Sequence, residues 1–98
     1  MQTTAVCLEP DRPIVGTATH LRGCIAARFP EQVMLHQHGC NGVQVQYSYP
    51  RVQYKILNGL PMIIGLAEGA SLVETIILEI ECLNLAGNIY KIIRKDVT

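Results

Sequence analysis

The sequence predicts a single α+β domain in which two helices pack on one face of an antiparallel sheet. Three observations support this class. Apolar residues recur every three or four positions over residues 17–29, as in an amphipathic helix, and alternate with polar residues over 43–56, as in strands. Asn58-Gly59, the strongest short signal for a β-hairpin, lies between two strand-like segments. The 98 residues are enough for one hydrophobic core.

A strand and a helix are expected at the N-terminal end. Thr3 to Leu8 is short, apolar and rich in β-prone residues, and Glu9-Pro10-Asp11 ends it. The helix is expected from about Thr17 to Phe29, and Pro30 ends it because proline cannot continue a helix. The apolar stripe of this helix consists of Ala18, Leu21, Cys24, Ile25 and Phe29.

The central part of the chain predicts strands joined by a tight turn. From Val43 to Tyr49, valines and tyrosines alternate with polar residues, so the valines and tyrosines share one face. Pro50 interrupts this ladder, and the alternation continues from Arg51 to Ile56. Asn58-Gly59 predicts a type I′ turn, after which Leu60 to Leu66 forms the returning strand.

The C-terminal part predicts a short helix and a second hairpin. Ser71-Leu72-Val73-Glu74 matches a capping box, which predicts a helix from about Ser71 to Ile76. Ile77 to Leu83 and Ile89 to Lys95 are the expected strands on either side of an Ala86-Gly87 turn. The resulting order, β-α-β-β-α-β with the last strand extended into a C-terminal hairpin, is the ferredoxin-like pattern. The second face of the sheet is left for solvent, RNA or another domain.

Charge is distributed unevenly, although the formal net charge is zero. Residues 1–58 hold five basic and three acidic side chains, a net of +2, and residues 59–98 hold three basic and five acidic ones, a net of −2. All three histidines lie in the first part, so an anionic ligand is expected to bind there. No apolar run reaches the roughly 20 residues of a membrane span, and no secretory signal is present, so we expect a cytoplasmic protein with reduced cysteines.

Two histidines lie one residue apart, at His36 and His38, between a basic segment and the tyrosine-bearing strand. Histidine has an unperturbed pKa of about 6.5, so at neutral pH one imidazole can accept a proton while another donates one. With arginines and tyrosines nearby in the sequence, this pair suits acid–base chemistry on a phosphodiester.

Several longer motifs resemble one family. They are Leu21-Arg22-Gly23, Phe29-Pro30-Glu31, Leu35-His36-Gln37-His38, Tyr49-Pro50-Arg51-Val52-Gln53-Tyr54-Lys55, Gly59-Leu60-Pro61-Met62-Ile63-Ile64-Gly65 and Glu68-Gly69-Ala70. Together they resemble the CRISPR repeat-processing endoribonucleases, and more narrowly the N-terminal ferredoxin-like domain of the type B branch. The resemblance covers residues 20–76, and the flanking strands are consistent with it.

The resemblance implies cleavage of CRISPR precursor RNA by attack of a ribose 2′-OH on the adjacent phosphorus, with no metal or other cofactor. It implies that His36 and His38 are the acid–base pair and that Tyr47 or Tyr49 orients the phosphate or supports the acid. The residues expected to bind the RNA are Arg22, Arg28, Arg51 and Lys55.

The family has two ferredoxin-like domains, the second of which grips the repeat RNA through a glycine-rich loop. We expect residues 1–98 to form one such domain, without the second, RNA-gripping domain. The expected partners are therefore CRISPR repeat RNA and either a second copy of the chain or a second ferredoxin-like domain. The apolar content of 49% also favours a covered face.

Two alternatives remain open, so enzyme activity is not assumed. The first is a non-catalytic assembly module of the same fold that binds RNA or protein, which the zero net charge favours. The second is a zinc-binding domain, because nitrogen and sulfur ligands occur near one another in the sequence. These ligands are His20, Cys24, His36, His38 and Cys40.

Overall fold

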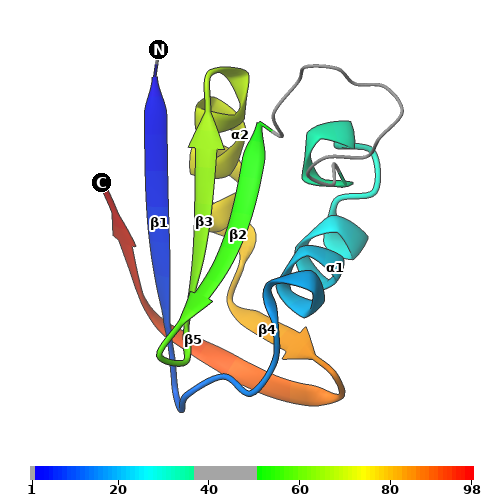
Figure 1. Cartoon of the computed structure of the whole chain (residues 1–98), viewed down its shortest axis with the longest axis vertical. Helices are drawn as coiled ribbons and strands as arrows, with labels where there is room; N and C mark the ends of the chain where they lie inside the picture. Colours follow the sequence, from blue (N-terminus) through cyan, green and yellow to red (C-terminus); the bar gives the residue numbers. More distant parts are fainter. Residues whose placement is uncertain (1, 37–50) are drawn as a thin grey trace.

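The computed structural model describes residues 2–36 and 51–98. Within these ranges the chain forms a five-stranded antiparallel sheet, two α-helices and two short 3-10 turns (Figure 1). The elements are β1 (Thr3–Pro10), α1 (Ala18–Arg28), η1 (Val33–His36), β2 (Val52–Leu57), β3 (Leu60–Leu66), α2 (Glu68–Ile76), η2 (Ile77–Glu79), β4 (Cys82–Leu85) and β5 (Asn88–Val97).

The strand order, β2-β3-β1-β5-β4, confirms the predicted ferredoxin-like class. β3 lies between β1 and β2, while β5 borders β1 on its other side. β4 extends this sheet as the partner of β5, which is the predicted C-terminal hairpin. Neither α-helix of the described ranges has the length and hydropathy needed to span a bilayer.

The core lies between one face of the sheet and both helices. α2 packs against β1 and β3, whereas α1 packs against β2 and β4 (Figure 1). Alternate residues of β1 and β3 are buried, so only one side of these strands faces the helices. Buried side chains from both helices and from all five strands form one cluster, and this confirms the two-layer arrangement.

Both predicted turns are confirmed. Asn58 and Gly59 have φ angles of 54° and 78°, the positive values that a type I′ turn requires, and they join β2 to β3. Ala86 and Gly87 have φ angles of 51° and 86° and join β4 to β5 in the same way. The first helix is also confirmed, because α1 begins after Thr17, which caps it.

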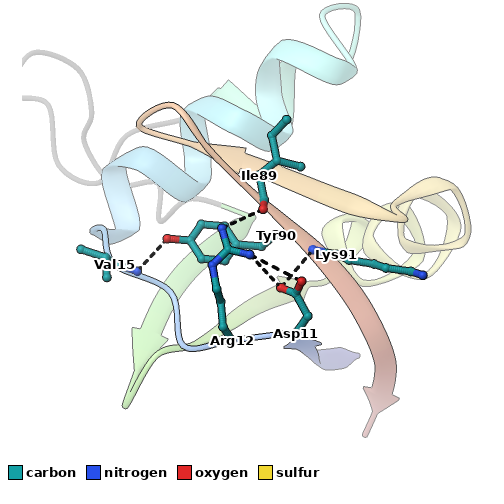
Figure 2. Close-up of polar contacts among 6 residues, drawn as sticks. All are labelled: Asp11, Arg12, Val15, Ile89, Tyr90 and Lys91. Carbon is teal, nitrogen blue, oxygen red and sulfur yellow. Dashed lines mark hydrogen bonds and ion pairs between the residues drawn. The ribbon is translucent and has the colours of Figure 1, made fainter.

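The connection from β1 to α1 is tied to β5 by polar contacts (Figure 2). The guanidinium of Arg12 lies 4.4 Å from the centre of the Tyr90 ring and donates a hydrogen bond of 2.9 Å to the carbonyl of Ile89. The backbone amide of Asp11 donates to the carbonyl of Lys91 at 2.8 Å. These contacts hold the start of α1 in place at the end of the sheet away from η1 (Figure 1).

The predicted start of the second helix is wrong. α2 begins at Glu68, three residues before Ser71, and its preceding residue Ala67 makes no side-chain cap. Ser71 is inside the helix, and Glu74 accepts a hydrogen bond of 2.7 Å from Thr4 of β1 instead of closing a capping box. The early start depends on tertiary packing, which the local sequence pattern does not contain.

Two glycines permit this packing. A Cβ atom on Gly65 would collide with the backbone of Gly69, and a Cβ atom on Gly69 would collide with the carbonyl of Arg51. The first turn of α2 therefore lies directly against β3 and against the residue that precedes β2. Small residues at these positions are what bring the three segments together.

The predicted strand over 77–83 is wrong in its first half. Ile77–Glu79 forms the 3-10 turn η2, and β4 begins at Cys82. Ile76, Ile77 and Ile80 are all buried. In a strand, successive side chains point to opposite faces, so these three could not all face one core. The turn directs these three side chains into one core.

We expect Gly69→Ala to destabilise the domain by about 1–3 kcal/mol, because the added methyl group meets fixed backbone. Gly23→Ala is the matched control, since Gly23 is exposed within α1 and nothing lies within 4 Å of an added Cβ. This control should stabilise by about 0.5–1 kcal/mol through helix propensity. Urea unfolding of both variants measures the difference, and equal stability of the two would contradict the packing described.

Candidate functional site

The candidate site is centred on His36, the last residue of η1. Its side chain is exposed. The other predicted catalytic residues, His38, Tyr47 and Tyr49, lie outside the described residues, as does the predicted strand from Val43 to Tyr49. Their predicted roles therefore remain predictions.

The turn η1 is placed by its connection to α1 and by one buried side chain. The amide of Gln32 donates to the carbonyl of Phe29 at 3.0 Å, and the amide of Leu35 donates to the carbonyl of Gln32 at 3.1 Å. Leu35 itself is 0% exposed and belongs to the main core. Because Leu35 points inward, the next residue, His36, is presented to solvent.

Tyr54 of β2 joins this turn to the sheet. Its hydroxyl donates a hydrogen bond of 2.9 Å to the carbonyl oxygen of Leu35. Burial raises the pKa of the Tyr54 hydroxyl well above its ordinary value, and the positive charge of Arg22 opposes this shift to a smaller extent. The phenol is therefore neutral and able to donate at physiological pH. Arg22 of α1 acts electrostatically on the same hydroxyl that supports the His36 turn.

Two other predicted RNA-binding residues lie on or beside β2. Arg51 precedes β2, and its Nε lies 3.3 Å from the Oε1 of Glu68 in the first turn of α2. Its side chain is 46% exposed, so it is accessible to an anion. Lys55 is exposed and follows Tyr54 directly, which places it on the opposite face of the sheet from the hydroxyl contact.

Arg28 of α1 connects the helix to the start of β4 through hydrogen bonds. Its guanidinium donates to the carbonyl of Glu79 at 2.8 Å and to the carbonyl of Cys82 at 3.4 Å. Four residues earlier on α1, the thiol of Cys24 forms a hydrogen bond with the backbone of Asn84 in β4. Burial raises the pKa of this thiol. The helix thus covers the free edge of β4. The predicted RNA contact of Arg28 would have to share a guanidinium that already binds two carbonyls.

The zinc alternative finds no support within the described ranges. His20 takes part in a capping box, because its Nδ1 accepts a hydrogen bond of 3.1 Å from the amide of Thr17. No group of three potential metal ligands occurs among the residues that the structure describes. Two residues of the predicted ligand set, His38 and Cys40, lie outside those residues.

Sequence reasoning did not identify the contact that Tyr54 makes with the turn before His36. The available signal was the position of Tyr54 in β2, where it shares the inward face with Val52 and Ile56. A tyrosine at such a position needs a partner for its hydroxyl. The partner, the carbonyl of Leu35, is 19 residues away in the sequence, and a local pattern does not reveal it.

Comparison with known proteins gives two matches. The family model described as "Cas6b N-terminal domain" matches residues 1–98. A crystal structure of Cas6b is similar in fold, with a TM-score of 0.74 and 24% sequence identity. That match covers 98% of this chain and 44% of the Cas6b chain, so the sequence spans less than half of that protein. No curated protein sequence matches significantly.

We expect the stability of the domain to fall as the pH rises above about 10, because the unfolded chain loses the Tyr54 proton near the ordinary tyrosine pKa while the folded chain retains it. The raised folded pKa therefore contributes stability below pH 10 that is lost as the pH rises through the folded pKa. Tyr54→Phe, which has no proton to lose, should show a shallower decline in urea unfolding between pH 9 and 11. Identical slopes for the two proteins would contradict the burial of this hydroxyl.

Proposed function

Because the chain belongs to the family of Cas6b N-terminal domains, we propose that it supplies the acid–base residues of an endoribonuclease that processes CRISPR precursor RNA. The observation that carries this proposal is the exposed His36 at the end of a turn whose backbone is hydrogen-bonded to Tyr54 of the sheet. The enzyme would act in the cytoplasm on CRISPR repeat RNA.

In the proposed reaction a ribose 2′-OH attacks the adjacent phosphorus, and the bond from phosphorus to the 5′ oxygen breaks. One imidazole of the His36 and His38 pair accepts the 2′-OH proton, and the other donates a proton to the departing 5′ oxygen. The products are a 2′,3′-cyclic phosphate and a 5′-hydroxyl. Tyr47 or Tyr49 would orient the phosphate, and no metal or other cofactor is required.

The basic side chains would hold the RNA. Arg22 is the favoured phosphate ligand because it acts on the Tyr54 hydroxyl next to the His36 turn. Arg51 is half exposed and would bind a neighbouring phosphate. The phosphate would replace Glu68 as its ion-pair partner, because an ion pair between two exposed side chains is weak. Arg28 and Lys55 would make outer contacts, since the described geometry places neither beside the Tyr54 hydroxyl.

A second domain or a second copy of the chain is the proposed protein partner. The face of the sheet away from the helices carries an apolar stripe from β1 and β3, and its side chains are only partly covered. The stripe consists of Ala5, Cys7, Met62, Ile64 and Leu66. Apolar surface of this kind favours association. The alternative function, a non-catalytic assembly module, would use the same face.

We expect His36→Ala and His38→Ala each to slow cleavage of a cognate repeat RNA by about 10²–10⁴-fold, because each imidazole transfers a proton in the transition state. Single-turnover rates at saturating protein measure the effect. Cleavage should persist in EDTA and stop when the nucleotide before the cut carries a 2′-deoxyribose. Undiminished cutting by either variant would remove that histidine from the mechanism. No cutting by the unmodified chain would favour the assembly module or show that a second domain is required.

We expect Arg22→Ala to weaken binding of the repeat RNA and to reduce the slope of log K against log salt by about 0.7, the value for one contact to a single-stranded phosphate. Arg94→Ala is the matched control, because Arg94 is exposed and pairs with Glu9 and Asp96 on β1 and β5, away from the candidate site. It removes the same charge and should leave the slope unchanged. Equal slopes for the two variants would show that Arg22 does not contact a phosphate.

A further inference from the structure

The peptide group between Leu35 and His36 is fixed from two sides. The Leu35 side chain is fully buried in the main core, and the carbonyl oxygen of Leu35 accepts the hydrogen bond of 2.9 Å from Tyr54. This carbonyl belongs to the same planar unit as the backbone nitrogen of His36. The backbone that leads into His36 is therefore held both by packing and by a hydrogen bond.

The group that donates this hydrogen bond is itself rigid. Tyr54 lies in the middle of β2 and pairs with Ile63 of β3, which is fully buried. Its ring packs against the main core, and a tyrosine side chain has few rotatable bonds. By contrast, η1 has only four residues, and a 3-10 turn of that length has little stability of its own.

We propose that Tyr54 is the positioning residue that fixes His36 relative to the sheet. This inference rests on the proposed function, because positioning has a chemical consequence only if His36 transfers a proton. A displacement of about 1 Å in a catalytic group can slow a reaction by about 100-fold. Without the hydroxyl, the Leu35 carbonyl would bond to water, and the His36 backbone would lose its link to β2.

The chain contains a matched control for this role. The hydroxyl of Tyr90 accepts a hydrogen bond of 3.1 Å from the backbone amide of Val15, so it too joins a connecting segment to a strand. Tyr90 is on β5 beside the connection from β1 to α1 (Figure 2), and Figure 1 shows that β5 begins at the end of the molecule away from η1. Tyr54→Phe and Tyr90→Phe therefore each delete one hydroxyl with one backbone partner, but only the first deletion touches the His36 turn.

The first experiment is single-turnover cleavage of repeat RNA by residues 1–98 carrying either substitution. We expect Tyr54→Phe to lower the maximal rate by about 10–100-fold while the RNA dissociation constant changes less than twofold. Tyr90→Phe should change neither quantity by more than twofold, although both variants should lower the thermal midpoint to a similar extent. A Tyr54→Phe rate equal to that of Tyr90→Phe would overturn the inference.

The second experiment does not depend on cleavage. In NMR spectra of the free protein, Tyr54→Phe should shift the backbone amide and imidazole resonances of His36 and speed hydrogen exchange of its amide, and Tyr90→Phe should leave them unchanged. Unchanged His36 signals in Tyr54→Phe would overturn the inference. If the signals shift but His36→Ala cleaves at the normal rate, positioning of His36 stands and its proposed catalytic role fails.

Discussion

Leu35 links the helical layer to the sheet at the point where the chain presents its exposed histidine. Its side chain is fully buried in the main core, and its carbonyl accepts a hydrogen bond from Tyr54 of β2. Among the described residues, Met34 of the same turn also packs against the core, and the amide of Gln32 donates to the carbonyl of Phe29 just after α1. The backbone that leads into His36 is held to β2 by the contact between Leu35 and Tyr54.

The basic side chains divide into two groups according to what they bind within the molecule. Arg12 and Arg28 bind backbone carbonyls, and they secure the β1–α1 connection and the edge of β4. Arg22 acts electrostatically on Tyr54, and Arg51, which precedes β2, pairs with the exposed carboxylate of Glu68. A count of arginines in the positive half of the sequence could not separate these roles, because the partners are backbone atoms of distant segments.

The features that the sequence predicted correctly are those with local causes. Asn58 and Gly59 accept positive φ angles, so their turn could be recognised from two residues, and the period of α1 could be read from its apolar stripe. The start of α2 could not be predicted in this way, because it depends on the contact of Gly65 with Gly69. For the site, the spacing of two histidines suggested acid–base chemistry, and the family resemblance supplied the tyrosines. The support from Tyr54 required the tertiary structure.

The central claim is that His36, fixed by its anchored turn, meets the scissile phosphate of a bound RNA together with Arg22. The most direct measurement is ¹⁵N NMR of the histidine side chains during titration with a repeat RNA that carries a 2′-deoxyribose at the cut and so remains intact. The account predicts that binding shifts the resonances of the His36 imidazole nitrogens, and that Arg22→Ala reduces this shift. His36 signals that are the same with and without saturating RNA would contradict it.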